Sequence, residues 1–266
     1  MKLCLIGYGK MGKAVEAAAI QRNHSIISRI SPNNPASDFH EIHEHSLQNA
    51  DVCIDFSHPK AVASNARSIV EKGKNLVIGT TGWDKNLEEI QNLSKKFPVG
   101  ILYSANFSLG VNAFYRIIEH AAKLFQHFEQ YDVSGLESHH KNKVDSPSGT
   151  AKFLSAILLK NLERKSTCVS NIENRAIAPQ ELHFNSIRCG CDPGTHTITF
   201  DSPCDSISLT HKARNRDGFA MGSIIAAEWL VNKKGLYTFR DMIDEFLQKG
   251  FSKDSQDQKQ NIKIMQ

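Results

Sequence analysis

The sequence predicts an α/β protein with a parallel sheet covered by helices in its N-terminal part and a central α+β domain. Two observations carry this prediction. Short apolar runs alternate with helical periodicity up to residue 105, whereas residues 186–213 alternate apolar and polar side chains one by one. The first pattern is typical of a parallel sheet with both faces covered, and the second of antiparallel strands with one solvated face.

Five apolar runs define the expected N-terminal strands: residues 2–6, 25–30, 52–56, 76–78 and 99–103. Helical periodicity lies between most of them, at residues 13–20, 61–70 and 87–93. Further along we expect a helix at 111–128, a strand at 131–136, a helix at about 150–162, and final helices at 219–231 and 239–247. The expected domains are 1–108 joined by the returning segment 217–250, then 109–216, with a polar, disordered tail at 251–266.

The composition, 40% hydrophobic and 23% charged, is typical of a soluble globular protein. The segment before Gly7 is too short for a secretory signal, so we expect a cytoplasmic protein. No apolar run approaches the roughly 20 residues that cross a bilayer, so we expect no membrane association. The net charge of +4 is spread along the chain, which argues against nucleic acid and suits a small anionic ligand. Without an export signal, the six cysteines are expected to be free thiols.

A glycine-rich motif follows the first expected strand directly and opens a helix: Gly7, Tyr8, Gly9, Lys10, Met11 and Gly12. Glycines at this spacing allow a tight turn, close approach of the backbone to a pyrophosphate, and close packing of helix on strand. The helix N-terminus then offers its unpaired N–H groups to phosphates. The strand before the motif and the strand–helix series after it favour a Rossmann-like dinucleotide-binding domain over glycines that merely permit a turn.

The end of the second strand bears on the choice of cofactor. An acidic residue there favours the unphosphorylated dinucleotide, and this chain instead has Arg29 with no acid beside it. We therefore predict a preference for NADPH with NADH possible; the alternative is that Arg29 is a solvated surface cation. Two loops follow the fourth and fifth strands, where open α/β sheets bind ligands, and each is either a nicotinamide site or a plain loop. They contain Gly79, Thr80 and Thr81, and Ser104, Ala105, Asn106 and Phe107.

Side chains that can bind or transfer a proton are most concentrated between residues 137 and 151. His139, His140, Lys141 and Lys143 would repel one another unless an anion such as a dicarboxylate joins them. Pro147 and Ser148 then begin a helix whose first turn, Gly149 and Thr150, offers N–H groups and a hydroxyl to a carboxylate. A histidine that titrates near neutrality can deliver a proton, and a lysine among cations can assist it.

Other interpretations of these residues stay open. Residues 137–151 could form an exposed basic loop followed by a capped helix. A zinc site is disfavoured because adjacent histidines point in different directions and no cysteine or histidine partner lies at the usual spacing, so no metal is expected. A second histidine cluster, at His40, His43 and His45, alternates with glutamates and favours a solvated face, with no role assigned.

The sequence motifs together match a known family, and the match extends from about residue 2 to residue 247. The chain closely resembles the 4-hydroxy-tetrahydrodipicolinate reductase family, also called dihydrodipicolinate reductase. The motifs that carry the resemblance are Gly7-x-Gly9-x-x-Gly12, Asp55-Phe56-Ser57, Gly79-Thr-Thr-Gly82, Ala105-Asn106-Phe107-Ser108, Glu137-x-His139-His140-x-x-Lys143-x-Asp145-x-Pro147-Ser148-Gly149-Thr150-Ala151 and Phe219-Ala220.

The resemblance implies an enzyme of the diaminopimelate and lysine pathway that uses NADH or NADPH to reduce a cyclic unsaturated dicarboxylate to tetrahydrodipicolinate. It also implies a homotetramer assembled through the central sheet. By motif, His139 would donate the proton with Lys143 assisting, and His140, Lys143, Gly149 and Thr150 would hold the substrate carboxylates. The cofactor would be held by residues 7–12, Arg29, residues 79–81 and residues 104–107.

The chain departs from the family pattern in two places. The acidic residue often found at the end of the second strand is replaced around Ser28, and Lys141 stands where arginine is frequent, so its role is left open. Two other functions predict different residues. A semialdehyde dehydrogenase should have a nucleophilic cysteine or a different lysine motif after the fifth strand, and a non-catalytic nucleotide sensor should lack the group from His139 to Thr150.

Overall fold

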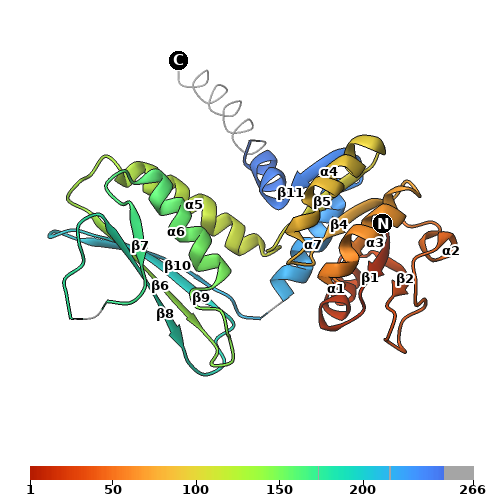
Figure 1. The fold of residues 1–266 in the computed structure, drawn as a ribbon, viewed down its shortest axis with the longest axis horizontal. Coiled ribbons are helices and arrows are strands. Elements are labelled where there is room, and N and C mark those ends of the chain that lie inside the picture. The colour runs from red at the N-terminus through yellow and green to blue at the C-terminus, as the bar shows by residue number, and fades with distance from the viewer. Residues whose placement is uncertain (173, 216, 249–266) are drawn as a thin grey trace, which may run out of the picture. The chain divides into compact units, whose positions relative to one another are not determined.

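The computed structural model describes residues 1–172, 174–215 and 217–248. Contacts divide the chain into two compact units, one of Met1–Ser108 with the chain from Asp217 onward, and one of Leu109–Arg216 (Figure 1). The predicted polar tail lies outside the described residues. Within the described ranges, no helix has both the length and the apolar character needed to cross a membrane.

Unit 1 contains a six-stranded, fully parallel sheet in the order β11-β5-β4-β3-β1-β2. The strands are β1 Lys2–Ile6, β2 Ser25–Ile30, β3 Val52–Asp55, β4 Asn75–Ile78, β5 Gly100–Tyr103 and β11 Gly235–Thr238. The helices are α1 Lys10–Gln21, α2 Glu44–Leu47, α3 Val62–Val70, α4 Leu87–Lys96 and α7 Asp217–Leu230, with short 3₁₀ turns at Pro59–Ala61 and Asp84–Asn86. Residues 239–248 are also helical. The predicted α/β class is confirmed.

Every residue of β3 and β4 but Asn75 is buried, which explains why the strands are continuous apolar runs rather than alternating ones. Helices α1 and α7 pack against each other. Strand β11 was not expected from the sequence. Its four residues are only half-buried and carry no apolar run, and its place in the sheet comes from parallel pairing with β5.

Unit 2 contains a five-stranded mixed sheet in the order β10-β9-β6-β8-β7. Its strands are β6 Asp132–His139, β7 Thr167–Val169, β8 Glu181–Arg188, β9 Thr195–Asp201 and β10 Ser206–Lys212. Helices α5 Leu109–Phe125 and α6 Gly149–Asn161 lie on one face (Figure 1). Their apolar residues, including Phe114 and Leu154, form one core with Phe184 and Phe200 of the strands.

The expectation of antiparallel strands over residues 186–213 is right for β9 and β10 and wrong for β8. Strand β8 pairs in parallel with both β6 and β7. Residue-by-residue alternation shows that one face is buried, but it carries no information about strand direction. The chain reaches β8 from β6 by way of α6 and β7, and such a crossover connection produces a parallel neighbour.

Candidate active site

The glycine motif lies in the turn from β1 into α1, and two of its glycines are required by close packing. Gly7 has a φ of +86°, and a Cβ on it would lie 2.4 Å from the carbonyl oxygen of Phe56. A Cβ on Gly12 would lie 2.4 Å from the carbonyl oxygen of Gly7. Gly9 has open space where its Cβ would be and leaves the start of α1 without a side-chain cap. The first N–H groups of α1 are thus suited to a pyrophosphate.

Arg29 is partly exposed, but it is not an isolated cation. In β2, its guanidinium pairs with Glu16 and, at 3.1 Å, with Asp38, and lies 5.7 Å from the centre of the Tyr8 ring. The hydrogen bond to Glu16 is the main reason that the pKa of Arg29 is raised. Tyr8 donates its hydroxyl to the same Glu16. Sequence reasoning missed Glu16 and Asp38, since neither lies in a motif.

The loops after β4 and β5 lie at the same edge of the sheet as the glycine turn, since β1, β3, β4 and β5 are parallel neighbours. Gly79 is needed because its Cβ would lie 2.1 Å from the Phe56 ring. Thr80 is buried, and its hydroxyl donates to Asp55 Oδ1 at 2.9 Å. Thr81 is exposed.

The loop after β5 is ordered by its own polar groups. The Ser104 hydroxyl donates to the carbonyl of Asn106 at 2.8 Å, and Asn106 Oδ1 accepts the N–H of Ser108 at 2.8 Å. Ala105 is exposed, whereas the Phe107 ring is buried against Phe239 and Phe56. Phe107 therefore has only its backbone to offer a ligand.

In unit 2, strand pairing brings together polar groups that are distant in sequence. Glu137 and His139 both lie on the inward face of β6. The register places His196 of β9 opposite Glu137, and Arg188 of β8 opposite His139. We call these four residues the Glu137 cluster.

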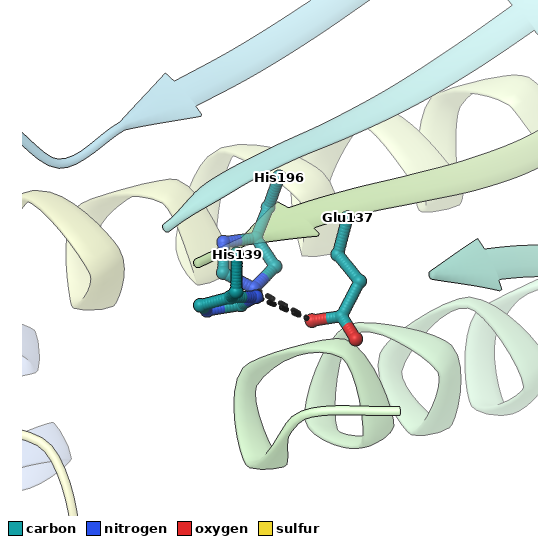
Figure 2. A group of neighbouring side chains, drawn as sticks. All are labelled: Glu137, His139 and His196. Atoms are coloured by element: carbon teal, nitrogen blue, oxygen red, sulfur yellow. Dashed lines mark ion pairs between the residues drawn. The ribbon is translucent and has the colours of Figure 1, made fainter. Parts of the chain in front are cut away.

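The carboxylate of Glu137 is fully buried, and its two oxygens have different neighbours. Figure 2 shows one of these oxygens directed at the two imidazoles. Oε1 accepts three hydrogen bonds, from Ser148 N at 2.9 Å, Ser186 Oγ at 2.6 Å and Arg188 Nη2 at 2.9 Å. Oε2 faces the two imidazoles, 3.2 Å from His139 Nδ1 and 3.5 Å from His196 Nε2. Burial alone would raise the pKa of Glu137, but His196, Ser148 and Ser186 outweigh it, so the pKa is lowered and the group is ionised.

His139 is 7% exposed at the last position of β6. Burial lowers the pKa of His139 to about 4, the Glu137 carboxylate opposes this, and His196, Lys143 and Arg188 lower it further. In the free protein the ring is therefore neutral at pH 7. A ligand that brings negative charge would raise its pKa.

The remaining predicted residues follow β6 directly. His140 donates its N–H to the carbonyl of Asp192 at 2.7 Å, and Lys143 Nζ lies 2.6 Å from Asp145 Oδ1. Ser148 caps α6, its Oγ accepting the N–H of Ala151 at 3.2 Å. Gly149 begins α6 with open space where its Cβ would be, and Thr150 follows it. The side of Gly149 toward that space is thus open to a carboxylate.

Sequence spacing missed His196 and Arg188, since they lie in strands far from residue 139. The signal available for His196 was its core-facing position in an alternating strand, where a histidine needs a polar partner. Glu137, His139 and His196 offer atoms within 4.8 Å of one another, the spacing of a possible metal site. The other histidine cluster is different: His43 caps α2, His45 contacts Gln48 and His40 contacts the carbonyl of Ser31.

Comparisons with known proteins cover both units. The family model described as dihydrodipicolinate reductase, N-terminus, matches residues 1–107, and the C-terminus model matches residues 110–243. A 4-hydroxy-tetrahydrodipicolinate reductase of Christiangramia forsetii is 35% identical, covering 92% of this chain and 98% of its own. One from Staphylococcus aureus is 37% identical, covering 91% and 100%.

Among solved structures, a dipicolinate-bound dihydrodipicolinate reductase from Paenisporosarcina sp. TG-14 has a similar fold. Its TM-score is 0.74 with 23% sequence identity, covering 91% of this chain and 98% of that one. An amine dehydrogenase from Mycobacterium smegmatis follows with a TM-score of 0.53, 11% identity, and coverage of 90% and 95%. Since two family models together span nearly all the described residues, the chain belongs to the dihydrodipicolinate reductase family of pyridine-nucleotide oxidoreductases.

Proposed function

We propose that the protein reduces 4-hydroxy-tetrahydrodipicolinate to tetrahydrodipicolinate with NAD(P)H, in the cytoplasmic pathway to diaminopimelate and lysine. The observation that carries this proposal is the Glu137 cluster, a buried imidazole ordered by a carboxylate and followed directly by Lys143 and the start of α6. This arrangement offers one proton donor beside several groups that bind carboxylates. A ring dicarboxylate that must gain a proton matches both features.

The residues that would hold the substrate have complementary charge. Lys143 and His140 offer cationic or N–H groups, and Gly149 and Thr150 offer the first turn of α6, whose dipole favours an anion. The similar protein from Paenisporosarcina has dipicolinate bound, and dipicolinate is a dicarboxylate on a ring. That ligand supports the same class of substrate here.

The proton step is assigned to His139, with Lys143 assisting. Once a dicarboxylate offsets the positive charge of Lys143 and Arg188, the pKa of His139 rises from its low value in the free protein. The ring then carries a proton that it can give to the carbon next to the reduced position. After the transfer, the Glu137 carboxylate still faces Nδ1 and holds the neutral ring.

The residues of unit 1 fit a nicotinamide dinucleotide, and the cofactor supplies the hydride when bound. The open side of Gly9 and the uncapped start of α1 suit the pyrophosphate, together with Lys10 and Met11. Gly79, Thr80 and Thr81, and the loop from Ser104 to Phe107, lie at the carboxyl ends of β4 and β5, which is the place for the nicotinamide.

We further propose that NADPH is preferred and that Arg29 carries the preference. Glu16 and Asp38 already pair with Arg29, so a 2′-phosphate competes with two carboxylates and the preference should be modest. Arg29→Ala should lower the ratio of kcat/KM for NADPH to that for NADH by about tenfold, the value of one charged hydrogen bond. Steady-state kinetics with both cofactors measure this ratio.

The matched control is Asp38→Asn, which removes one competitor of the 2′-phosphate. This variant should raise the same ratio, because Arg29 keeps its charge while losing a counter-charge at 3.1 Å. An unchanged ratio in Arg29→Ala would contradict the assigned role of Arg29.

We propose a homotetramer assembled through the sheet of unit 2. Helices α5 and α6 cover one face of this sheet, whereas Leu136 and Ile187, whose side chains lie on the other face, are each more than 40% exposed. Exposed apolar strand residues gathered on one sheet are typical of an assembly interface. Sedimentation equilibrium should give four times the mass of the 29.7 kDa chain, and a monomer mass would exclude this assembly.

The reaction is tested by following a label. With deuterium at the transferable position of NADPH and the substrate generated from pyruvate and aspartate semialdehyde, the product should gain one deuterium by mass spectrometry. A product without the label would contradict the proposed reaction, even if the protein binds NADPH.

A further inference from the structure

The way in which the His139 ring is held decides how it can donate the proton in the reaction proposed above, and the role assigned below rests on that reaction. Both nitrogens of an imidazole matter to a proton donor, because the partner of one decides whether the other carries a proton. His139 Nδ1 is buried and has no conventional hydrogen bond within the described residues, and the same is true of Glu137 Oε2. These two atoms lie 3.2 Å apart. Each is thus the natural partner of the other.

The carboxylate is itself fixed. Oε1 is occupied by three donors from two segments: Ser148 at the start of α6, and Ser186 and Arg188 in β8. With Oε1 saturated, rotation of the carboxylate would break all three bonds, so Oε2 stays directed at the imidazoles. An ionised carboxylate accepts hydrogen bonds only, which requires the proton on Nδ1 of His139.

Nε2, the other ring nitrogen of His139, lies beside Gly194, where no larger residue would fit. A Cβ on Gly194 would lie 2.9 Å from His139 Nε2, too close for the ring to stay where it is. Gly194 is in turn held in the β8–β9 connection by its N–H, which donates to Asp192 Oδ1 at 2.9 Å. Nδ1 therefore faces the protein interior, and Nε2 is the atom left to exchange a proton.

We propose that Glu137 is a positioning residue for the reduction: its buried carboxylate holds Nδ1 of His139, so that Nε2 delivers the proton to the substrate. Arg188 links the same carboxylate to the loop that carries Lys143, because its Nη2 also donates to the carbonyl of Asp145 at 2.6 Å. The Glu137 side chain thus contacts the proton donor and the start of α6 directly, and the loop of Lys143 through Arg188.

A metal ion held by Glu137, His139 and His196 is the competing explanation of the same spacing. The guanidinium of Arg188 disfavours it, because it already compensates the single carboxylate at 2.9 Å and would repel a divalent cation. The positioning role needs no further charge. The two explanations differ in their response to a chelator.

The decisive variant is Glu137→Gln, which keeps the shape of the side chain and replaces the hydrogen-bond acceptor Oε2 with an N–H donor. With its amide oxygen toward the three donors, the amide N–H group faces Nδ1 and opposes protonation of that nitrogen. The charged, proton-donating ring is then disfavoured. We expect kcat to fall by about 10²-fold, with KM for NADPH unchanged and with activity recovering as the pH is lowered.

Glu137→Asp tests the negative charge apart from its placement, since it keeps the carboxylate on a side chain that is shorter by one methylene. It should have an intermediate kcat and a pH profile close to that of the unchanged protein, and it carries the test if the glutamine variant does not fold. The charged and titratable groups facing the ring are His196, Arg188, Lys143 and, through His196, His211. None of them is altered by either substitution, so a shift of the profile reports Glu137.

A control with the same chemical change lies elsewhere in unit 2. Glu181→Gln also replaces a carboxylate by an amide, in β8 at an ion pair with Arg175 and outside the Glu137 cluster. This variant should leave the pH profile unchanged. A folded Glu137→Gln with normal kcat, or with kcat lowered equally at every pH, would overturn the proposal.

Two further measurements distinguish a metal site from the positioning role, and failure of the positioning role from failure of the proposed function. Activity of the unchanged protein that is lost on dialysis against EDTA and restored by Zn²⁺ would assign the cluster to a metal and overturn the positioning role, whereas full activity after dialysis supports it. Absence of turnover by the unchanged protein would refute the proposed function itself. That result is distinct from an effect confined to the Glu137 variants.

Discussion

Replacing His139 with glutamine should lower kcat on the order of 10²- to 10⁴-fold, the usual loss when a well-placed acid is removed. Glutamine keeps the polar character of the site but has no proton to give at neutral pH. Because His139 is buried and contacts Glu137, circular dichroism and NADPH binding must first show that the variant folds. The rate is then measured by oxidation of NADPH with the condensed substrate.

The pH dependence has a definite sign. An acid acts only while protonated, and the pKa of His139 in the free protein is lowered to about 4, first by burial. The kcat/KM of the unchanged protein should therefore fall as the pH rises toward and beyond neutrality, and His139→Gln should lack this decline. His40→Gln, at a surface histidine, is the control and should behave as the unchanged protein. A less than tenfold loss in His139→Gln would remove His139 from the mechanism.

Lys143→Ala should lower kcat/KM by a comparable factor, about 10²-fold or more, for a partly different reason. The variant loses a positive charge for a substrate carboxylate, worth about 1.5–3 kcal/mol for a charged hydrogen bond, and also the group that assists the proton transfer. In the free protein Nζ lies 2.6 Å from Asp145 Oδ1, so a substrate carboxylate would have to displace Asp145 or share Nζ with it.

The matched control is Lys141→Ala, two residues earlier in the same loop. Lys141 is exposed, and its backbone N–H bonds to the carbonyl of Gly190, so its removal should change kcat/KM less than tenfold. Michaelis–Menten kinetics on both variants give the comparison. Equal losses in the two would mean that the loop contributes only general positive charge, with no specific place for Lys143.

The sequence was sufficient for β1 to β5 because each contains a short apolar run, as expected where both faces of a parallel sheet are covered. It was insufficient for β11, which is short and half-buried, and for the direction of β8, which alternation does not encode. Strand direction depends on the connection between strands, and that connection is visible only in the fold.

The residues of the candidate site also divide into those that the sequence indicates and those that only the fold reveals. His139, Lys143 and the start of α6 lie within a dozen residues, so local spacing was enough to bring them together. His196 and Arg188 reach Glu137 through strand register, and Glu16 and Asp38 reach Arg29 through tertiary packing. Such long-range pairs leave no periodic signal, and for this reason the two carboxylate partners of Arg29 were not expected from the sequence.

The most direct measurement is NADPH oxidation by the purified protein with substrate formed in place from pyruvate and aspartate semialdehyde, alongside His139→Gln and Lys143→Ala. The account predicts oxidation that requires the condensed product and nearly disappears in both variants, with NADPH binding intact. Oxidation that needs only one of the two precursors, or that survives in both variants, would contradict it.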